Sequence, residues 1–336
     1  MPANCVSCIE TGPKCEWNKA WFGNPTSTKT LPGFCRGSRQ HVLRGDFNGD
    51  GRMDIMCHDS SSGNMWIYYG ANNGYSVVGW NKPMSWCWHA GASLYIGDFN
   101  GDSRDDILCH DNAGYLFIAY TDKSGDFSTG WYENMGFCKC AGCSLFVGDF
   151  NGDKKSDLLC HDGKDGKKWI VYATPKGEFQ DAIIWYKPMN WCHGGNEKLY
   201  VGDFNGDSRS DMLCYDDVTG IVITACANCG GSFDETDNTN SMGWCTVKGC
   251  SLSVARVSKD QRDDLVCHCK SRSIEPLRVR FPASNDGFET FRQWRGARSW
   301  CKKTTEMLVI GPLKPGHCGS MVCIDKVTGQ YSIAFP

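Results

Sequence analysis

The sequence predicts an all-β fold built from repeated units of about 53 residues. Four near-identical acidic segments recur along the chain, and each is followed by a short apolar run typical of a strand. The segments read GDFNGDGRMDIMCHD from Gly45, GDFNGDSRDDILCHD from Gly97, GDFNGDKKSDLLCHD from Gly148 and GDFNGDSRSDMLCYD from Gly202. Cysteines at equivalent positions of the units recur at 57, 109, 160, 214, 267 and 323, and they set the length of the unit.

Each acidic segment has the ligand pattern of a calcium loop. In the first copy, Asp46, Asn48 and Asp50 alternate toward one centre. The main-chain carbonyl of Arg52 can add an oxygen, and Asp54 returns as a carboxylate that can bind through both oxygens. These are the hard oxygen ligands that calcium prefers. The equivalent groups are Asp98, Asn100, Asp102, the carbonyl of Arg104 and Asp106 in the second copy, Asp149, Asn151, Asp153, the carbonyl of Lys155 and Asp157 in the third, and Asp203, Asn205, Asp207, the carbonyl of Arg209 and Asp211 in the fourth. We therefore expect four Ca²⁺ ions.

The flanking residues distinguish these loops from an EF-hand. An EF-hand also begins with D-x-N-x-D, but it has a glutamate at the twelfth position and a helix on each side. Here the twelfth position is a cysteine, such as Cys57, and the flanks are strand-like, so each loop joins two strands. The alternative is an Asx-rich turn without metal, because Asp, Asn and Gly are ordinary turn residues. We favour the metal, because three carboxylates within one turn repel one another unless a cation neutralises them.

Two later copies of the unit have lost the metal pattern. Around Ala255 the loop reads ARVSKDQRDDLVCHC, with Arg256 in place of the first aspartate and Ser258 in place of the asparagine. Around Gly311 it reads GPLKPGHCGSMVCID, with no acidic ligand before Asp325. The chain therefore contains six units, near residues 41–92, 93–143, 144–197, 198–250, 251–306 and 307–336.

The strand content of a unit predicts a β-propeller. One unit contains a strand (SLYIGDF), the loop, a second strand (DILCHD), a turn, a third strand (LFIAYT) and a final strand, and four short strands make one propeller blade. The last unit stops at YSIAFP, before its outer strand. The stretch from Cys15 to Cys35 can supply that strand, so the N-terminal segment (residues 1–40) closes the ring and removes its exposed edges. We expect a single domain over residues 1–336 with six blades, or seven if residues 1 to 30 form a blade of their own.

The loops resemble the FG-GAP and VCBS repeats of integrin α-subunit propellers and of calcium-containing propeller lectins of fungi. The resemblance covers residues 41–336, strongly in four units and weakly in two. It implies that calcium is a structural ion that ties two strands of a blade together, and it implies no catalytic residue. The cysteine content departs from the family pattern.

The 22 cysteines are regularly spaced. An aromatic-Cys pair precedes every loop, 22 residues before the cysteine that follows it, in all six units. This constant offset predicts one disulfide per unit, unless both positions recur only because the unit does. The predicted bridges are Cys35 to Cys57, Cys87 to Cys109, Cys138 to Cys160, Cys192 to Cys214, Cys245 to Cys267 and Cys301 to Cys323. Among the others, Cys5/Cys8, Cys140/Cys143 and Cys226/Cys229 have C-x-x-C spacing, which indicates zinc, redox chemistry or, as we favour, further bridges.

Disulfides and calcium sites together predict a secreted protein. The sequence shows no signal peptide and no apolar stretch long enough for membrane insertion, so we expect a mature extracellular form. The formal net charge is −3, and four calcium ions would raise it by eight to +5, which is too weak a bias to indicate nucleic-acid binding.

Residues that break the repeat are candidates for ligand binding. Most aromatic residues recur in register and are expected in the core between blades. Trp88, His89 and His193 instead follow the bridge cysteine in two units, beside Gly-rich turns. An exposed aromatic ring can stack on a sugar, and repeated sites give avidity. The recurrent histidines His58, His110, His161 and His268 share their register position with Tyr215, which favours a structural role over metal binding.

The sequence therefore predicts a multivalent lectin that binds glycans or glycoproteins. The alternative is an adhesion or matrix module with an extracellular protein partner. A glycan-active hydrolase is a third class, but we expect no enzyme, because no catalytic motif is present and the paired aspartates belong to the loops.

Overall fold

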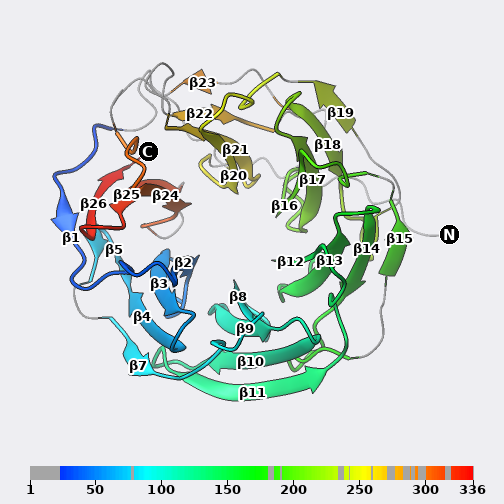
Figure 1. The fold of residues 1–336 in the computed structure, drawn as a ribbon, viewed down its shortest axis with the longest axis horizontal. Coiled ribbons are helices and arrows are strands. Elements are labelled where there is room, and N and C mark those ends of the chain that lie inside the picture. The colour runs from blue at the N-terminus through cyan, green and yellow to red at the C-terminus, as the bar shows by residue number, and fades with distance from the viewer. Residues whose placement is uncertain are drawn as a thin grey trace.

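The computed structural model describes residues 23–76, 79–180, 185–189, 191–233, 238–241, 243–258, 260–270, 277–282, 288, 292–293, 300–314 and 319–335. Six four-stranded antiparallel sheets stand around a central axis as the blades of a closed ring (Figure 1). Within these ranges there is no helix, and hence none that is long and apolar enough to cross a membrane. The prediction of an all-β, single β-propeller with six four-stranded blades is confirmed.

Blades 1 to 5 each run outward from the axis in chain order. Blade 1 contains β2 (Gln40–Gly45), β3 (Asp54–Asp59), β4 (Asn64–Tyr68) and β7 (Asn81–Pro83), with a small hairpin of β5 (Gly70–Ala71) and β6 (Gly74–Tyr75). Blade 2 contains β8 (Ser93–Gly97), β9 (Asp106–His110), β10 (Tyr115–Thr121) and β11 (Phe127–Asn134). Blade 3 contains β12 (Cys143–Gly148), β13 (Asp157–Asp162), β14 (Lys167–Val171) and β15 (Trp185–Pro188). Blade 4 contains β16 (Glu197–Gly202), β17 (Asp211–Asp216), β18 (Ile221–Ala225) and β19 (Asn238–Ser241). Blade 5 contains β20 (Cys250–Ala255), β21 (Asp264–Cys269), β22 (Leu277–Arg280) and β23 (Arg292–Gln293).

Blade 6 is completed by the N-terminal segment. It contains β24 (Glu306–Gly311), β25 (Ser320–Asp325) and β26 (Gln330–Ala334), and its outer strand is β1 (Lys29–Thr30). Lys29 lies opposite Tyr331, and the amide of Gly23 donates to the carbonyl of Phe335 at 2.9 Å. The predicted ring closure is thus confirmed for the described part of the segment. The seven-blade alternative is wrong, because Lys29 and Thr30 belong to the sixth blade.

The second strand of each blade is buried on both faces, which explains its continuous apolar sequence. In β3, β13 and β17 every residue except the last is buried. The phenylalanine in each acidic loop packs edge-on against a phenylalanine of the next blade, with ring centroids 5.9–6.1 Å apart. The pairs are Phe47 with Phe127, Phe99 with Phe179, Phe150 with Phe233 and Phe204 with Phe288. Each loop is therefore anchored in the core between two blades.

All six predicted disulfides are present. The first cysteine of each of these six bridges has a positive φ, between 31° and 63°, which costs energy for a residue with a side chain. The bridge holds this left-handed turn in place before the innermost strand begins. Two further bridges join Cys140 to Cys143 and Cys250 to Cys269, so zinc at the Cys140/Cys143 pair is not supported. Cys5, Cys8, Cys15 and Cys318 lie outside the described residues.

Candidate metal loops and inter-blade cavity

The first acidic loop is folded around its own carboxylates. Asp46 accepts hydrogen bonds from the amides of Asp50 (3.1 Å) and Gly51 (2.7 Å), and the side-chain oxygen of Asn48 accepts from the amide of Asp50 (3.0 Å). The second, third and fourth loops repeat this pattern closely. These are Asx-type turns, and they gather the first, third and fifth positions of the loop on one side.

The last aspartate of each loop clamps two segments of its blade together. Asp54 is fully buried and accepts the amide of Phe47 at 2.9 Å on one oxygen and that of Gly70 at 2.7 Å on the other. Asp106, Asp157 and Asp211 make the equivalent pairs, with the amides of Phe99 and Thr121, Phe150 and Ala173, and Phe204 and Ala227. The sequence predicted these residues as metal ligands but not as clamps between the loop and the end of the third strand.

The loops concentrate negative charge where water is scarce. Burial, with a smaller contribution from neighbouring carboxylates, raises the pKa of Asp54 and of Asp106 to about 7 and that of Asp157 to about 8, although backbone amides oppose the shift. Burial also raises the pKa of Asp203 to about 6. Such carboxylates stay ionised at neutral pH when a cation neutralises them. The donor set and its electrostatics therefore fit a divalent cation with a preference for oxygen ligands.

The side chain at the seventh position forms an ion pair that the sequence analysis missed. Arg52 lies 2.8 Å from Asp50, and Lys155 lies 3.1 Å from Asp153. The second and fourth loops have the same pairs, Arg104 with Asp102 and Arg209 with Asp207. Among the described residues, every set of three or more His, Cys, Asp or Glu ligand atoms within 4.8 Å of one another contains cysteine, so no loop gathers its three carboxylates that closely. The available sequence signal was the basic residue two positions after the aspartate at the fifth loop position.

Backbone hydrogen bonds link the loops into a closed ring. In every blade, the residue before the clamp position donates its amide to the carbonyl at the first loop position of the preceding blade. The pairs are Met53 to Pro312 (2.5 Å), Asp105 to Asp46 (2.8 Å), Ser156 to Asp98 (2.7 Å), Ser210 to Asp149 (2.6 Å), Asp263 to Asp203 (2.6 Å) and Gly319 to Arg256 (3.0 Å). The two units without the metal pattern take part as well, so the ring of bonds does not depend on the acidic ligands.

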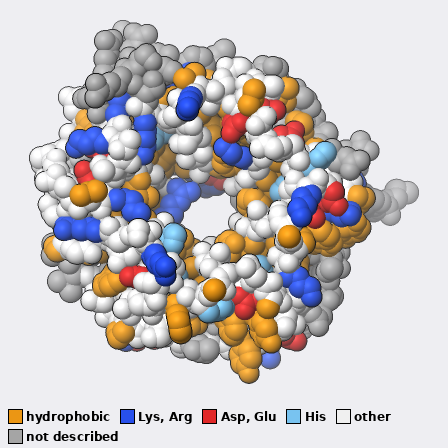
Figure 2. All heavy atoms as spheres, viewed as in Figure 1, with side chains coloured by type: hydrophobic (Ala, Val, Ile, Leu, Met, Phe, Trp, Pro, Cys, Tyr) orange, Lys and Arg blue, Asp and Glu red, His pale blue; other side chains and the backbone are white. Residues whose placement is uncertain are grey.

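The six innermost strands surround an axial channel, visible as the opening at the centre of Figure 2. Its cavity of about 570 Å³ is lined mainly by Leu, Val, Ile and Tyr. Arg44 is the charged residue of this lining, and its guanidinium donates to the carbonyls of Ile310 and Val254 on blades 6 and 5. The arginine thus crosses between blades and satisfies two carbonyls beside the channel.

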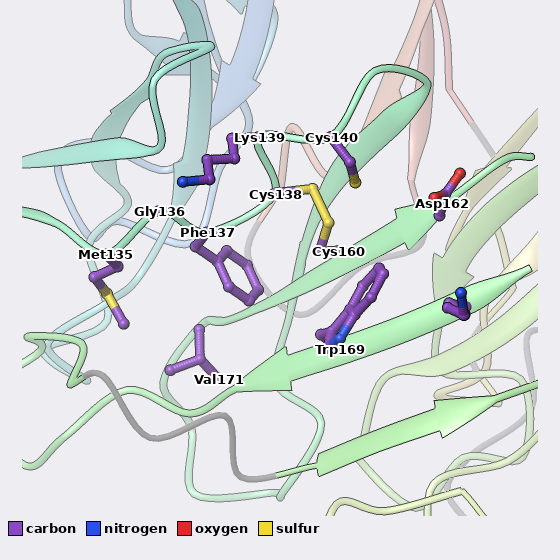
Figure 3. A pocket seen from close by; sticks show the side chains of 11 residues that line it. Met135, Gly136, Phe137, Cys138, Lys139, Cys140, Cys160, Asp162, Trp169 and Val171 are labelled. Carbon is purple, nitrogen blue, oxygen red and sulfur yellow. A yellow bond between two sulfur atoms is a disulfide. The ribbon is translucent and has the colours of Figure 1, made fainter.

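A separate cavity of about 300 Å³, called the inter-blade cavity below, lies between blade 3 and the linker that joins it to blade 2 (Figure 3). The linker that follows β11 supplies Phe137, Lys139 and Cys140 to one side. Blade 3 supplies Asp162 and Trp169 to the other side, and Figure 3 shows the Trp169 ring directed toward the Cys138–Cys160 bridge. The cavity therefore combines aromatic walls with a carboxylate and an ammonium group.

Exposed aromatic residues extend this surface over two neighbouring blades. Tyr186, 48% exposed, stacks on Trp169 with centroids 5.6 Å apart. At the equivalent position of blade 2, Tyr132, 68% exposed, stacks on Phe117 at 6.0 Å. Apolar side chains reach the surface near these outer strands, at the right and the bottom of the view (Figure 2). The equivalent pairs of blades 1, 4 and 5 are Trp66 with Asn81, Ile223 with Thr239, and Arg278 with Gln293.

The predicted ligand-binding residues lie on the linkers between blades, but they do not form one site. Trp88 is 53% exposed, and the ring nitrogen of His89 lies 3.3 Å from the carboxylate of Asp111. His193 is exposed on the linker between blades 3 and 4, two linkers further along the chain. Counted from the bridge cysteine, Trp88 and His193 correspond to Lys139, which lines the inter-blade cavity.

The recurrent histidines tie each blade to the next linker. His110 and His161 are buried, and their Nε2 atoms lie 2.8 and 2.7 Å from the carbonyls of Phe137 and Cys192. Tyr215 makes the same contact by donating its hydroxyl to the carbonyl of Trp244 at 2.8 Å. Burial and the neighbouring ammonium of Lys168 together lower the pKa of His161 to about 4. These contacts agree with the structural role predicted from the tyrosine at this position.

A family model described as FG-GAP-like repeat matches residues 46–109, 98–160 and 149–214, which together span half of the chain. A search of curated proteins finds no match. Among solved structures, the chain is similar to an Agrocybe aegerita lectin that specifically recognises non-reducing terminal N-acetylglucosamine. The TM-score is 0.62 at 14% identity, over 88% of this chain and 79% of the lectin. The β-propeller domain of Myceliophteria thermophila Cps50 (Swd1) aligns over 96% of this chain and 99% of its own, with 9% identity and a TM-score of 0.45.

Proposed function

Because the chain belongs to the FG-GAP-like repeat family and folds as a single six-bladed propeller, we propose that it is a multivalent lectin that binds glycans or glycoproteins between its blades. The observation that carries the proposal is the inter-blade cavity, where Trp169 faces polar groups of the linker and of blade 3. An aromatic wall with a few convergent polar groups is the arrangement that binds a sugar, since the ring covers its apolar face and the polar groups bind its hydroxyls.

The dimensions and chemistry of the cavity support a small saccharide. A volume of about 300 Å³ is at the lower end of small-molecule sites. Asp162 can accept hydrogen bonds from hydroxyl groups, and Lys139 can donate to ring or carbonyl oxygens. The lectin of similar fold recognises terminal N-acetylglucosamine, so this sugar is the first to test.

The second stacked pair, Phe117 with Tyr132, supports more than one weak site per molecule. Sites on adjacent blades engage one branched glycan or one cell surface together, and avidity then exceeds the affinity of each site. Trp88 and His89 follow the bridge cysteine of blade 2, at positions that correspond to Lys139 and Cys140 of the cavity. They belong to the blade 2 site under this proposal.

Calcium in the four acidic loops is part of the proposal. In the first loop the ion would be held by Asp46, Asn48, Asp50, the carbonyl of Arg52 and Asp54, and the other three loops offer the equivalent groups. The ion would neutralise carboxylates whose pKa burial and mutual repulsion raise. The eight disulfides of the described residues fit an extracellular protein, and we propose that it is secreted and that it has no enzymatic activity.

The test is a glycan array probed with the wild-type protein and with Tyr186→Ala, with and without a calcium chelator. Binding of a defined sugar class supports the lectin, and Tyr186→Ala should weaken it by about tenfold through loss of the stacked ring. The control is Val327→Ala on blade 6, whose side chain is 61% exposed and far from the cavity. A blank array with folded protein would contradict the proposal and would favour an adhesion module with a protein partner.

A further inference from the structure

The rim of the cavity carries a disulfide that the proposed function does not use. Cys140 lies in the linker before β12, Cys143 is the first residue of β12, and the amide of Cys143 donates to the carbonyl of Cys140 at 3.0 Å. Cys140 is exposed and lines the cavity, close to the Cys138–Cys160 bridge (Figure 3). In the seven other bridges between described residues, every cysteine is buried or half-buried. The Cys140–Cys143 bridge is therefore the accessible one among them.

Blade 5 contains a comparable pair of neighbouring disulfide bridges that is shielded from solvent. Cys250 occupies the same position on β20 as Cys143 on β12, but it is bonded across the sheet to Cys269. Cys267 and Cys269 are both fully buried, and their sulfur atoms lie 3.7 Å apart. In blade 3 the position opposite Cys143 is Asp162, so Cys143 is bonded to the linker instead. At both sites two disulfide bridges lie close together. The blade 3 site includes an exposed cysteine, whereas the cysteines of the blade 5 site are buried or half-buried.

Solvent exposure and the short loop that it closes both favour thiol–disulfide exchange at the Cys140–Cys143 bridge. A thiolate must reach a disulfide sulfur to displace the other one, so an exposed sulfur reacts faster than a buried one. In the chain-entropy model a bridge over three residues also stabilises the fold less than one over 19 or 22 residues. Opening the Cys140–Cys143 bridge leaves the Cys138–Cys160 bridge of the same blade in place.

We propose that the Cys140–Cys143 bridge is a site of reversible exchange with a low-molecular-mass anionic thiol that enters the inter-blade cavity. The thiolate of the small molecule attacks Sγ of Cys140, the Cys140–Cys143 bond breaks, and Cys143 leaves as a thiolate while Cys140 holds the mixed disulfide. The reverse attack by Cys143 on Cys140 expels the small thiolate and restores the bridge. No other oxidant or reductant is consumed in this cycle.

Charge at the cavity favours an anionic thiol. Lys139 lies between Cys138 and Cys140 in the sequence, and Lys167 lines the same cavity. Lys167 is paired with Asp165, whereas Lys139 forms no ion pair with any residue that the structure describes. A nearby ammonium group attracts an incoming thiolate and a carboxylate-bearing thiol alike.

Glutathione is the probe for this site. The wild-type protein is exposed to short pulses of reduced glutathione, quenched with an alkylating reagent, and analysed as peptides by mass spectrometry. We expect a glutathione adduct at Cys140 and alkylation at Cys143, formed at least about tenfold faster than modification of Cys250 or Cys269. Equal rates at the two sites, or modification only when the whole protein unfolds, would overturn the proposal.

Two variants test the role of Cys143 in releasing the adduct and the role of the Lys139 charge in forming it. Cys143→Ser lacks the resolving thiol, so its Cys140 is loaded with oxidised glutathione, which exchanges with the Cys140 thiolate and releases one glutathione thiolate. This adduct should persist after dilution, whereas the wild-type adduct should be lost. Lys139→Ala should slow adduct formation by glutathione but leave the rate with an uncharged thiol such as 2-mercaptoethanol unchanged. A Cys143→Ser adduct that is lost as fast as the wild-type adduct would contradict the cycle. These measurements contain no sugar, so they stand or fall independently of the lectin proposal.

Discussion

The first four acidic loops and the fifth loop have the same shape but different chemistry. Asp264 of the fifth loop is fully buried and accepts the amide of Val257 at 2.9 Å, as Asp54 accepts that of Phe47 in the first loop. The second donor differs, because the residue equivalent to Gly70 is Pro282, which has no amide hydrogen. Ser258 replaces it, and its hydroxyl lies 3.2 Å from Asp264 and 2.7 Å from Asp260.

This comparison separates two roles that the acidic loops combine. The fifth loop keeps the clamp and the backbone link to its neighbour without the first aspartate and the asparagine of the metal pattern. Arg256 stands in place of the first aspartate and lies 3.9 Å from Asp203 of the preceding loop, so it supplies positive charge beside that loop. The clamp aspartate therefore accounts for the fold of the loop, whereas the other aspartates of the first four loops fit a role in binding a cation.

Removal of calcium should produce the largest difference between the first four loops and the fifth loop. A site at a hundredfold excess of free calcium over its Kd contributes about 2.7 kcal/mol to the free energy of unfolding, so four sites would contribute roughly 10 kcal/mol. We expect four ions per chain by metal analysis. Chelation should increase the hydrogen-exchange rates of the backbone amides in the four acidic loops and should change those of residues 256–264 little. The four loops are residues 46–54, 98–106, 149–157 and 203–211. Uniform exposure of all five loops would show that the fifth loop depends on its neighbours.

The pH dependence should differ between the calcium-free and calcium-loaded forms. Burial raises the pKa of Asp54 and Asp106 to about 7 and of Asp157 to about 8, so the calcium-free folded state binds more protons than the unfolded state above about pH 4. Its free energy of unfolding therefore falls as the pH rises to about 8. Bound calcium keeps the carboxylates ionised and removes this slope, so the gap between the two denaturation midpoints should widen from pH 5 to 8. A constant gap would refute this account.

Loss of the clamp should destabilise both kinds of loop. Asp157→Ala and Asp264→Ala each leave buried donors without an acceptor, at a cost of roughly 2–5 kcal/mol in the free energy of unfolding. The two variants should be equally destabilised in chelator, as measured by urea denaturation. The control is Asp153→Ala in the same loop as Asp157, since its carboxylate is exposed and is held by the ammonium (3.1 Å) and the amide (3.0 Å) of Lys155. If Asp264→Ala left the free energy of unfolding unchanged, the clamp would contribute to stability only in loops that bind a metal ion.

Grafting the metal pattern into the fifth loop should have the smallest effect. Arg256→Asp combined with Ser258→Asn restores the D-x-N-x-D order before Asp264. We expect a fifth calcium ion that binds more weakly than the other four, because Pro282 has no amide to donate to the second oxygen of Asp264, where Gly70 donates to Asp54. Isothermal titration calorimetry measures the stoichiometry. If four ions still bind, the ligand order alone does not make a site in this fold.

The repeats predicted most of the fold because every unit had to bury the same strand. The constant 22-residue offset likewise predicted the six bridges, since a loop of fixed length fixes the distance between its ends. The cavity was not predictable, because it depends on how Phe137 of one linker meets Trp169 of the next blade. Tyr132 and Tyr186 were also missed as an exposed pair of sites, because their partners lie on another strand at a register that only the structure gives.

The local disulfides have a consequence for biosynthesis. Each of the eight bridges between described residues joins cysteines no more than 22 positions apart, so a blade can be oxidised soon after it leaves the ribosome. The ring, in contrast, closes only when β1 meets β26, which follows the other described strands in the chain. β1 therefore stays without its strand partner until β26 has been synthesised. Premature capture of that segment by a second chain would produce linked oligomers instead of closed rings.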